Sequence, residues 1–498
     1  MNKTTNTEFT PEFFELLGKF LENSKKPDEI QGNNETPKPL AKLFIKRGGP
    51  HNEVTGIRAI MAADYLVSKN KFFYAVAPNS EHGTYYLYNN EKGVYEPTSE
   101  VAIEAMVTEF LRSYNEVDIM TSRNRKEIIE LIRPSVPRVN YTEFNTDENI
   151  INFKNGILKL DEWELVPHSP EYFSTIQIPV NWNPEALATP VFDKYMNTLT
   201  ALHDDAPAVK QLLMETIGVV ISNIPGWKYK TSLLMFGKGN TGKSQLRKLV
   251  CDLIGSDNAA TIELDELESE RGPSKAFNKR LVGSPDMKFG TVSQMSKFKD
   301  IVGGDPVGIR WLYKEPFDAE LNCVFWNISN TLPLFGGDKG KHVYERIIPV
   351  RCDNVIPEEK RDPEIYEKML AEGEGIVYKA VFALIDTIRR GYKYTIPLSS
   401  KAETEGYKRS NNICIEFYDE FCTFDEEETP VMHTEAEVRR TFAGWAKLNY
   451  GSVPKIDEFE RTLKEYLNIS DDELHIRTKS MRSYCFTVSD EAFREYAF

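Results

Sequence analysis

Short apolar runs alternate with helix-like stretches between residue 205 and about residue 390. The run SLLMF at 232–236 is continuously apolar, which is typical of a strand buried on both faces. The segment SQLRKLVCDLIG then carries apolar residues at helical spacing and reaches a glycine, Gly255, which is a common helix terminator. Further apolar helices are predicted at 205–222 and 375–391. This alternation predicts an α/β core that contains a parallel sheet.

The flanking regions follow other patterns. Alternating aromatic and polar residues around an Asn/Gly-rich turn predict a β-hairpin, and a later run broken by glycine and proline predicts short strands. The predicted elements are a helix at 9–22, a polar linker at 23–39, two helices within 40–75, a hairpin at 83–97 and short strands at 149–171. Residues 411–498 predict three helices followed by two strands, an order that suits a small winged-helix domain.

Composition narrows the class of protein. A chain of 498 residues suggests about three domains, and 41% hydrophobic residues are enough for packed cores. No segment approaches the roughly 20 apolar residues needed to span a bilayer, and the first residues lack the apolar core of a signal peptide, so a cytoplasmic location is expected. The six cysteines form no Cys-x-x-Cys pair, which argues against a zinc site. A net charge of −15 requires any DNA contact to be concentrated in a few cations.

The glycine-rich segment GKGNTGKS lies between the predicted strand and helix. It fits G-x-x-x-x-G-K-[ST], in which backbone N–H groups and the helix amino terminus hold phosphates. Lys243 is expected to reach the β- and γ-phosphates, and Ser244 to ligate Mg²⁺. The predicted cofactors are therefore ATP and Mg²⁺. The predicted ATP-binding residues are Gly237, Lys238, Gly239, Asn240, Thr241, Gly242, Lys243 and Ser244.

A second Mg²⁺ ligand is expected at the end of a neighbouring strand. Asp286 follows a short strand that begins at Arg280 in KRLVGSPDM. Asp265 and Glu266 are the alternative, but the stretch before them is an amphipathic segment with few apolar residues. Strand character and spacing favour Asp286.

The order of GKGNTGKS, KRLVGSPDM, FKDIVGGDPVGIRWLYKEPF, CVFWNISNTLP and VYERIIPVR resembles the phage and plasmid primase-helicase family, whose members are superfamily 3 helicases of the AAA+ class. The resemblance covers about residues 60–400. It implies an α/β fold: an AAA+ superfamily 3 core, an α+β N-terminal domain and a C-terminal winged-helix-like domain. The implied boundaries are 1–40 for a helix and linker, 41–204 for the N-terminal domain, 205–400 for the motor and 401–498 for the last domain.

The resemblance also implies roles for residues of this chain. Asp286 matches the Walker B acid, Asn330 the sensor that orients water and γ-phosphate, and Arg346 an arginine finger supplied to the ATP of a neighbouring subunit. Asn330 could instead be a turn residue, and Arg346 a surface ion pair. Many family members carry a second acid after the Walker B acid, whereas Met287 stands here. Either another carboxylate serves as the base or hydrolysis is slow.

The segment from Gly303 to Trp326 predicts a hairpin with its tip near Lys314 and Glu315. In superfamily 3 helicases a hairpin at this place projects into the ring channel and its basic tip grips the DNA backbone. Lys314 is therefore the first candidate for DNA binding, and Arg310 and Lys299 are the next. A solvated structural hairpin is the alternative. The C-terminal cations could contact duplex DNA, but an acidic stretch at 424–430 makes a protein-docking role an open alternative.

Together these features predict an ATP-dependent replicative DNA helicase of a phage or mobile element, acting as a homo-hexamer on single-stranded or forked DNA in the host cytoplasm and with other replication proteins. Three alternatives remain open. The chain could be an origin-binding initiator that uses ATP as an assembly switch, or part of a primase-helicase, although no metal-binding Asp-x-Asp signature is evident before the motor. A P-loop kinase would leave the hairpin and finger segments unexplained.

Overall fold

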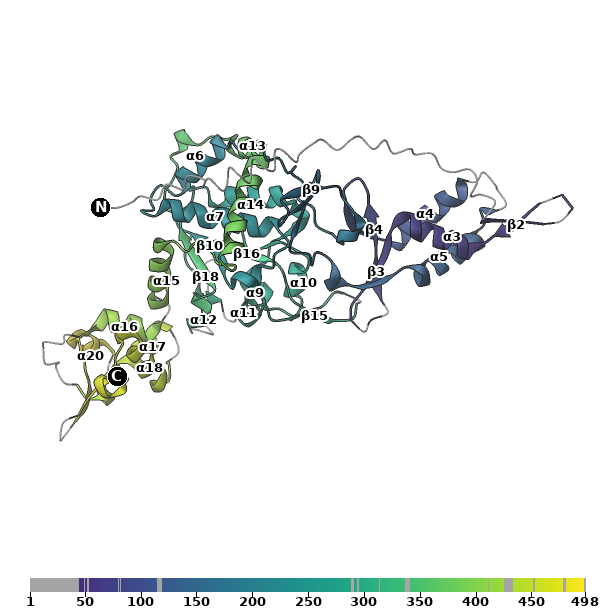
Figure 1. The fold of residues 1–498 in the computed structure, drawn as a ribbon. Coiled ribbons are helices and arrows are strands. Elements are labelled where there is room, and N and C mark those ends of the chain that lie inside the picture. The colour runs from purple at the N-terminus through teal and green to yellow at the C-terminus, as the bar shows by residue number, and fades with distance from the viewer. Residues whose placement is uncertain are drawn as a thin grey trace.

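The computed structural model of the chain describes residues 44–496 except 49, 52, 79, 81, 114–118, 288–290, 293–294, 313, 336–340, 411, 425–432, 451–452 and 478–480. The predicted helix at 9–22 and the linker at 23–39 lie outside the described residues. Helical and strand regions are mixed along the rest, so the predicted α/β class is confirmed. Figure 1 shows α3, α4 and α5 at one end, a central sheet, and a C-terminal module at the other end.

The N-terminal part combines a four-stranded sheet with three helices. Its sheet has the order β5-β4-β3-β6, with only the β3–β6 pair parallel. The elements are β1 (Ile45–Gly48), β2 (Glu53–Ile57), α3 (Ala59–Asn70), β3 (Phe72–Val76), β4 (Gly83–Asn89), β5 (Val94–Thr98), α4 (Glu100–Arg112), α5 (Ser122–Ser135) and β6 (Arg138–Asn140). The predicted hairpin at 83–97 is confirmed as β4 and β5.

The prediction of two helices within 40–75 is wrong for its first half. Ile45–Gly48 and Glu53–Ile57 pair as the antiparallel strands β1 and β2, and the helix α3 follows them. Along β2, Val54 and Gly56 are partly buried and alternate with the exposed Glu53 and Thr55, which is the spacing of a half-buried strand, and Ile57 is buried. The run is short, and its period is therefore easily mistaken for that of a helix.

A linking region joins this part to the central sheet. The predicted short strands at 149–171 are confirmed as an antiparallel meander, and two helices follow it. The elements are η2 (Tyr141–Glu143), β7 (Ile150–Phe153), β8 (Gly156–Lys159), β9 (Glu164–Val166), η3 (Pro170–Tyr172), α6 (Pro190–Leu199), α7 (Ala206–Ile221) and η4 (Gly226–Tyr229). Side chains from β7, β8, α6 and α7 contribute to the same hydrophobic core as the central sheet. The predicted boundary at 204/205 stays a prediction.

The central sheet has five parallel strands in the order β11-β12-β16-β10-β18. The strand β10 (Ser232–Phe236) lies between β16 (Val324–Ile328) and β18 (Ile347–Arg351), and all five of its residues are buried. The edge strands are β11 (Ala259–Ala260) and β18, and β12 (Leu281–Val282) lies between β11 and β16. Because the strands are parallel, their carboxyl ends lie along one edge of the sheet.

Helices and loops cover both faces of this sheet. Alternate residues of β10 illustrate this, since Leu233 and Met235 join one core cluster and Leu234 joins the other. The first face is covered by α7, α8 (Lys243–Ile254) and α14 (Gly373–Arg389). The second carries α9 (Leu264–Leu267), α10 (Gly272–Ala276), α11 (Ser296–Gly303) and the hairpin β14 (Val307–Ile309)–β15 (Phe317–Ala319). Residues of the N-terminal sheet, including Ala75 and Val139, also belong to this second cluster.

The C-terminal module has its own hydrophobic core. Helix α15 (Leu398–Ser410) follows α14, contacts β18 and leads into this module (Figure 1). The three predicted helices correspond to α16 (Ile413–Phe421), α17 (Glu435–Tyr450) and α18 (Ile456–Leu467), and the predicted strands begin with the pair β20 (His475–Arg477) and β21 (Arg482–Tyr484). The four-residue helix α19 (Asp471–Leu474) stands between them, and β22 (Thr487–Val488) and α20 (Asp490–Tyr496) follow. Two of its cations are paired, because Arg482 Nε lies 2.6 Å from Glu435 and Lys464 Nζ lies 2.7 Å from Asp471.

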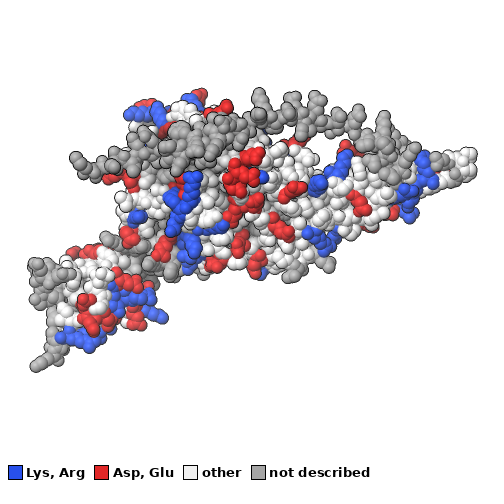
Figure 2. Space-filling model, viewed as in Figure 1, with Lys and Arg blue, Asp and Glu red and all other residues white. Residues whose placement is uncertain are grey.

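The described helices include none with the length and apolar character that a membrane span requires. On the face drawn in Figure 2, basic and acidic side chains are interspersed along the molecule. This mixture agrees with the sequence-based expectation that any DNA contact depends on a few cations.

Candidate nucleotide-binding site

The glycine-rich loop connects β10 to α8 at the carboxyl edge of the sheet. Gly237 has φ 121° and Gly242 has φ 104°, a region that favours glycine. A Cβ atom at Gly237 would lie 2.5 Å from Asp353 Oδ1, and one at Gly242 would lie 2.8 Å from the Tyr195 hydroxyl. Both glycines are therefore required by the fold of the loop. Between them, Lys238, Gly239 and Asn240 are exposed.

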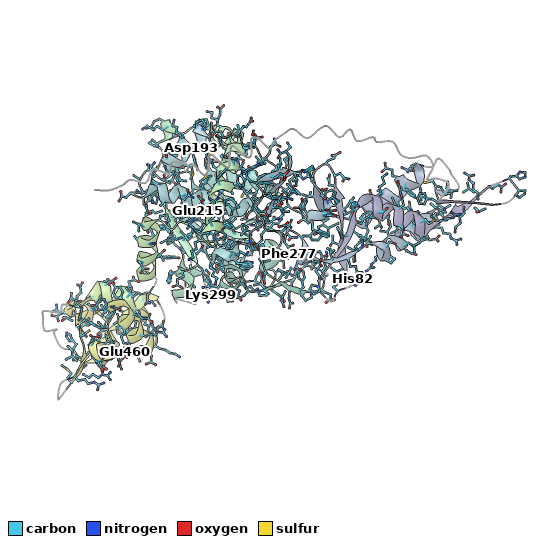
Figure 3. All side chains as sticks on the ribbon, viewed as in Figure 1. His82, Asp193, Glu215, Phe277, Lys299 and Glu460 are labelled. Carbon is cyan, nitrogen blue, oxygen red and sulfur yellow. The ribbon has the colours of Figure 1, made fainter. Side chains whose placement is uncertain are left out.

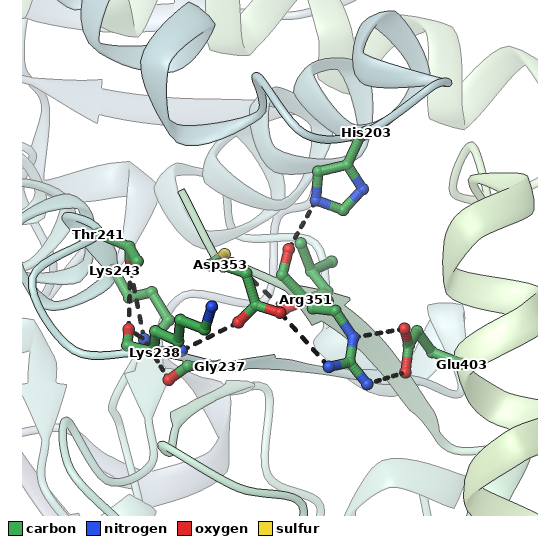
Figure 4. Close-up of polar contacts among 10 residues, drawn as sticks. His203, Gly237, Lys238, Thr241, Lys243, Arg351, Asp353 and Glu403 are labelled. Carbon is green, nitrogen blue, oxygen red and sulfur yellow. Dashed lines mark hydrogen bonds and ion pairs between the residues drawn. The ribbon is translucent and has the colours of Figure 1, made fainter. Parts of the chain in front are cut away.

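Lys243 is the first residue of α8 and is buried by the loop. Its ammonium group donates hydrogen bonds to the carbonyls of Gly237, at 2.8 Å, and Lys238, at 2.6 Å (Figure 4). Burial lowers the pKa of Lys243, and nearby groups that include Asp353 and Asp286 act in the opposite direction. The side chain thus lies within the curve of the loop, where the sequence motif predicts phosphate binding. Ser244 follows it and is exposed.

A carboxylate that the sequence reasoning missed, Asp353, supports the loop from the side. It accepts a hydrogen bond from the Lys238 N–H at 3.0 Å and lies 3.4 Å from Arg351, which in turn makes two bonds to Glu403 on α15 (Figure 4). Burial alone would raise the pKa of Asp353, but the Lys238 N–H and Arg351 lower it overall. Asp353 lies just beyond β18, the neighbour of β10. An acidic residue directly after a strand that flanks the loop strand is the sequence feature from which Asp353 could have been identified.

Asp286 lies at the same edge of the sheet, exposed, in a turn that follows β12. Asn327 on β16 accepts a bond from the Ser284 N–H at 2.9 Å, and the Asp286 N–H lies 3.3 Å from the Ser284 hydroxyl. The next residue, Met287, is 6% exposed and packs in the second core cluster. An acid at position 287 would therefore have to be buried in an apolar core.

Asp265 and Glu266, the alternatives to Asp286 as a Mg²⁺ ligand, lie in different surroundings from Asp286. Asp265 and Glu266 belong to the short helix α9, and Glu266 pairs with Lys275. Glu263, which the sequence reasoning did not consider, lies closer to the Asp286 turn, because its Oε1 is 2.6 Å from the Ser284 hydroxyl. No ligand distance tests the choice between these acids, and Asp286 stays a prediction.

Asn330 lies two residues beyond the end of β16 and is exposed. The Ser329 N–H donates to the carbonyl of Met235 on β10 at 3.0 Å, so the end of β16 is level with the start of the loop. The structure therefore brings Asn330 to the edge of the sheet that carries the loop and Asp286. Its predicted sensor role stays a prediction.

Arg346 lies at the opposite edge of the sheet. It precedes β18, and its carbonyl accepts from the Ser232 N–H at 2.7 Å, level with the first residue of β10. The loop begins after the last residue of β10, roughly 15 Å away at about 3.3 Å per residue. Arg346 is half-buried beside α11, where its charge acts on Asp300. This position is far from the loop of its own chain.

The predicted hairpin is confirmed as the antiparallel pair β14–β15. At its tip, Lys314 Nζ lies 2.5 Å from the Thr84 hydroxyl on β4 of the N-terminal part and 3.3 Å from the Tyr141 hydroxyl in η2, which directly follows that part. The ring of Tyr141 contacts Trp311 and Phe317 of the hairpin at centroid distances of 4.9 and 5.8 Å. The hairpin tip is thus packed against the N-terminal part.

The other two predicted DNA-binding cations have different neighbours. Arg310 Nη1 lies 2.5 Å from Glu270, and Lys299 is half-buried on α11. Figure 3 shows Lys299 on the side of the central region away from the N-terminal part, whereas Phe277 lies toward it. The structure does not gather Lys314, Arg310 and Lys299 into one patch, and their DNA-binding role stays a prediction.

A cavity of about 460 Å³ lies between the N-terminal part and the base of the hairpin. Its lining includes Tyr141, Phe144, Trp227, Phe277, Asp318 and Glu320. Among the described residues that line it, none belongs to the predicted nucleotide or DNA sites. The wall combines aromatic rings and acidic side chains with two cations, Lys279 and Arg280.

Comparisons with known proteins agree with part of the sequence interpretation. Residues 65–201 match the model of a family described as D5 N terminal like, and residues 235–346 match a family of unknown function, DUF5906. The apo A form of the NrS-1 C-terminal region is similar over 86% of this chain and 100% of that chain, with 13% identity and a TM-score of 0.50. Another apo structure of that region has 13% identity, covers 86% of this chain and 99% of that one, and has a TM-score of 0.48.

The match at 65–201 covers much of the N-terminal part, and the match at 235–346 covers the loop, Asp286, Asn330 and Arg346. The first structural likeness concerns the fold alone. Together the findings support a phage primase-helicase-like protein.

Proposed function

We propose that this chain is the ATP-dependent DNA helicase of a phage-like or mobile-element replication system, assembled as a hexameric ring. The observation that carries the proposal is the separation of the predicted catalytic residues between two edges of one sheet. The loop, Asp286 and Asn330 share the carboxyl edge, whereas Arg346 precedes β18 at the other edge. An arginine at that distance from its own loop can act only on the nucleotide of a neighbouring subunit, as in a ring of identical subunits.

In this proposal the chain's own groups hold the triphosphate of ATP. The N–H groups of the loop and the amino end of α8 face the phosphates, and Lys243 contributes its positive charge to the β- and γ-phosphates. Burial of the loop floor keeps water away from these contacts, which strengthens them. Asp353 would stabilise the loop through its bond to the Lys238 N–H at 3.0 Å.

The donor set also fits Mg²⁺, since a hydroxyl and a carboxylate at the same edge are the oxygen ligands that this ion prefers. Ser244 and Asp286 would hold it, and its charge would neutralise the phosphates during hydrolysis. Asn330 would orient the attacking water, and Arg346 of a neighbouring subunit would stabilise negative charge on the γ-phosphate.

DNA translocation would depend on the β14–β15 hairpin. Lys314 is the cation at its tip, and contact with a phosphate would require it to exchange its bonds to Thr84 and Tyr141 for a DNA oxygen. Such contacts would be independent of sequence and sensitive to salt. The C-terminal module, with its order of helices and paired strands, is proposed to be winged-helix-like and to contact duplex DNA or a replication protein.

A second candidate function is an initiator that uses ATP as an assembly switch. The buried Met287 favours it, because the residue after Asp286 cannot serve as a base. Slow hydrolysis that DNA does not stimulate would support the switch, whereas a helicase requires hydrolysis that DNA stimulates.

The test is ATP hydrolysis and strand displacement on forked DNA, together with the mass of the protein–DNA complex. For the wild type we expect a ring, DNA-stimulated ATP hydrolysis and strand displacement. For Lys243→Ala we expect neither ATP hydrolysis nor strand displacement. Lys248→Ala is the control, because Lys248 is exposed on the same helix and lies over the ring of Tyr366, 3.7 Å from its centroid. A wild-type protein that stays monomeric on DNA with ATP and separates no strands would contradict the proposal.

A further inference from the structure

The phosphate-loop helix contains a buried arginine, Arg247, one turn after Lys243. Only 4% of its surface is exposed. Its Nε donates to the carbonyl of Trp326 on β16 at 3.0 Å, and its Nη2 donates to the carbonyl of Gly283 at 2.7 Å. One side chain of α8 thus binds the strand that leads to Asn330 and the turn that leads to Asp286.

Burial of the charged Arg247 side chain costs free energy that an apolar side chain of similar size would not. A buried guanidinium loses its hydration, and apolar residues often fill such a position with equal or better stability. Arg247 Nη1 also lies 3.9 Å from the Cys251 sulfur, and among the described residues no carboxylate is hydrogen-bonded to the guanidinium. The two directed bonds therefore suggest that this side chain serves to hold the Trp326 and Gly283 carbonyls in place rather than to fill the core.

The turn that Arg247 holds is pressed tightly against β16. Gly283 has φ 131°, and a Cβ atom there would lie 2.6 Å from the Trp326 carbonyl and 2.7 Å from Asn327 Oδ1. The next residue, Ser284, is 1% exposed and is bonded to both Asn327 and Glu263. The sequence Gly-Ser-Pro, which interrupts the expected apolar strand, therefore forms a turn with several polar attachments.

We propose that Arg247 is a positioning residue that fixes Asp286 and the end of β16 relative to the phosphate loop. The inference rests on the proposed function of the loop and of Asp286. Arg247 and Lys243 belong to the same helix. A shift of the loop around a triphosphate and its divalent cation therefore moves Arg247, and the bond from Arg247 moves the Gly283 carbonyl with it. Ser284, Asn327 and Glu263 complete the attachment of the turn.

A matched control is available in Arg280. It is 2% exposed, and its guanidinium donates to the carbonyls of Val219 at 2.8 Å, Ile224 at 2.7 Å and Asn322 at 2.7 Å. Like Arg247 it is buried and bonded to backbone carbonyls, but it attaches the start of β12 to the end of α7. Loss of Arg280 removes an equally buried charge without touching the Asp286 turn.

The experiment measures the affinity of a fluorescent, non-hydrolysable ATP analogue with excess Mg²⁺ and with EDTA, on the full chain. The ratio of the two affinities is the gain that Mg²⁺ provides. For Arg247→Met we expect the affinity in EDTA to stay within about threefold of the wild type and the Mg²⁺ gain to fall about 10- to 100-fold, the usual effect of losing the support of a metal ligand. Arg247→Lys, which keeps the charge but not the planar fork, should recover part of the gain.

Arg280→Met should lower the unfolding temperature and leave the Mg²⁺ gain unchanged. An unchanged gain in Arg247→Met, or an equal loss in Arg280→Met, would overturn the inference. If Arg247→Met does not fold, Arg247→Lys and Ser284→Ala supply the same comparison, and unchanged gains in both would overturn it. A wild type that binds no ATP analogue would instead refute the proposed function and the inference with it.

Discussion

The loop edge of the central sheet and the tip of the β14–β15 hairpin both carry a lysine with a predicted phosphate partner, yet the two lysines are held differently. Lys243 is bonded to carbonyls of its own loop, five and six residues away in sequence. Lys314 is bonded to Thr84 and Tyr141, which precede it by 230 and 173 residues. One site is formed within a few residues, and the other depends on contact with a different part of the molecule.

The two lysines also differ in how much their surroundings must rearrange before a phosphate can be contacted. The geometry around Lys243 is fixed by Gly237 and Gly242, where any Cβ atom would overlap a neighbouring atom, so we expect the loop to bind phosphate with little rearrangement. Lys314 must leave one set of partners to reach another. We therefore expect the first lysine to govern chemistry and the second to govern contact with DNA, with the N-terminal part as a competitor for it.

The largest effect is expected for Lys243→Ala. Removal of a preorganised charge at the γ-phosphate should lower kcat for ATP hydrolysis by about 10²- to 10³-fold. Binding of single-stranded DNA in the absence of nucleotide should stay as in the wild type, which filter binding can measure. Equal loss of both activities would show that the two sites are not separable.

Lys314→Ala should give the opposite pattern. We expect DNA-free hydrolysis to be retained and stimulation by DNA to fall, because one phosphate contact per subunit is lost. The dependence of log K on log salt should become shallower by about one contact per subunit. A salt dependence identical to that of the wild type would mean that Lys314 does not contact DNA.

A smaller effect is expected for Tyr141→Phe, which removes the hydroxyl beside Lys314 and Thr84 and keeps the ring contacts with Trp311 and Phe317. Since a hydrogen bond contributes about 1 kcal/mol, DNA affinity should rise by up to about fivefold. Tyr88→Phe is the control, because Tyr88 lies on β4 of the N-terminal sheet and its ring contacts Tyr95 rather than the hairpin. A lower affinity in Tyr141→Phe would exclude competition by the N-terminal part.

The smallest effect is expected for Asp353→Asn, which removes the charge beside the loop. The pKa of Asp353 is lowered in the folded chain, so its contribution to stability is present above the ordinary aspartate pKa of about 3.9 and is lost as the pH falls through the lower folded value. We expect the variant to be less stable than the wild type by about 1 kcal/mol at pH 7, with the difference vanishing in acid. Urea unfolding at several pH values measures this, and a difference that grows in acid would contradict it.

Local sequence patterns correctly predicted the strand, the glycine-rich loop and the helix at the carboxyl edge of the central sheet. The strand 232–236 was predicted as observed, and the helix predicted from Ser244 begins one residue earlier, at Lys243. Both could be predicted because a buried parallel strand, a glycine loop and an amphipathic helix follow one another without interruption. The hairpin 307–319 was also predicted, since its proline and glycine residues mark its turns. In both cases short-range sequence determines the element.

Other features depend on contacts that sequence spacing does not reveal. Arg247 reads as an ordinary polar position on a helix, and only the fold brings it to β16 and the Asp286 turn. Asp353 gains its role from a parallel pairing across 115 residues. The contact of Lys314 with the N-terminal part likewise required the whole fold, so the sequence predicted a free hairpin tip and the structure shows a packed one.

The central claim is that each nucleotide site is completed by Arg346 of a neighbouring subunit, and mixing two inactive variants tests it most directly. Lys243→Ala subunits keep Arg346, and Arg346→Ala subunits keep the loop. Rings co-expressed from both variants, with a different tag on each, should recover hydrolysis at about a quarter of the interfaces, while each variant alone stays inactive. Mixed rings without any recovery, or full hydrolysis by Arg346→Ala alone, would contradict the account.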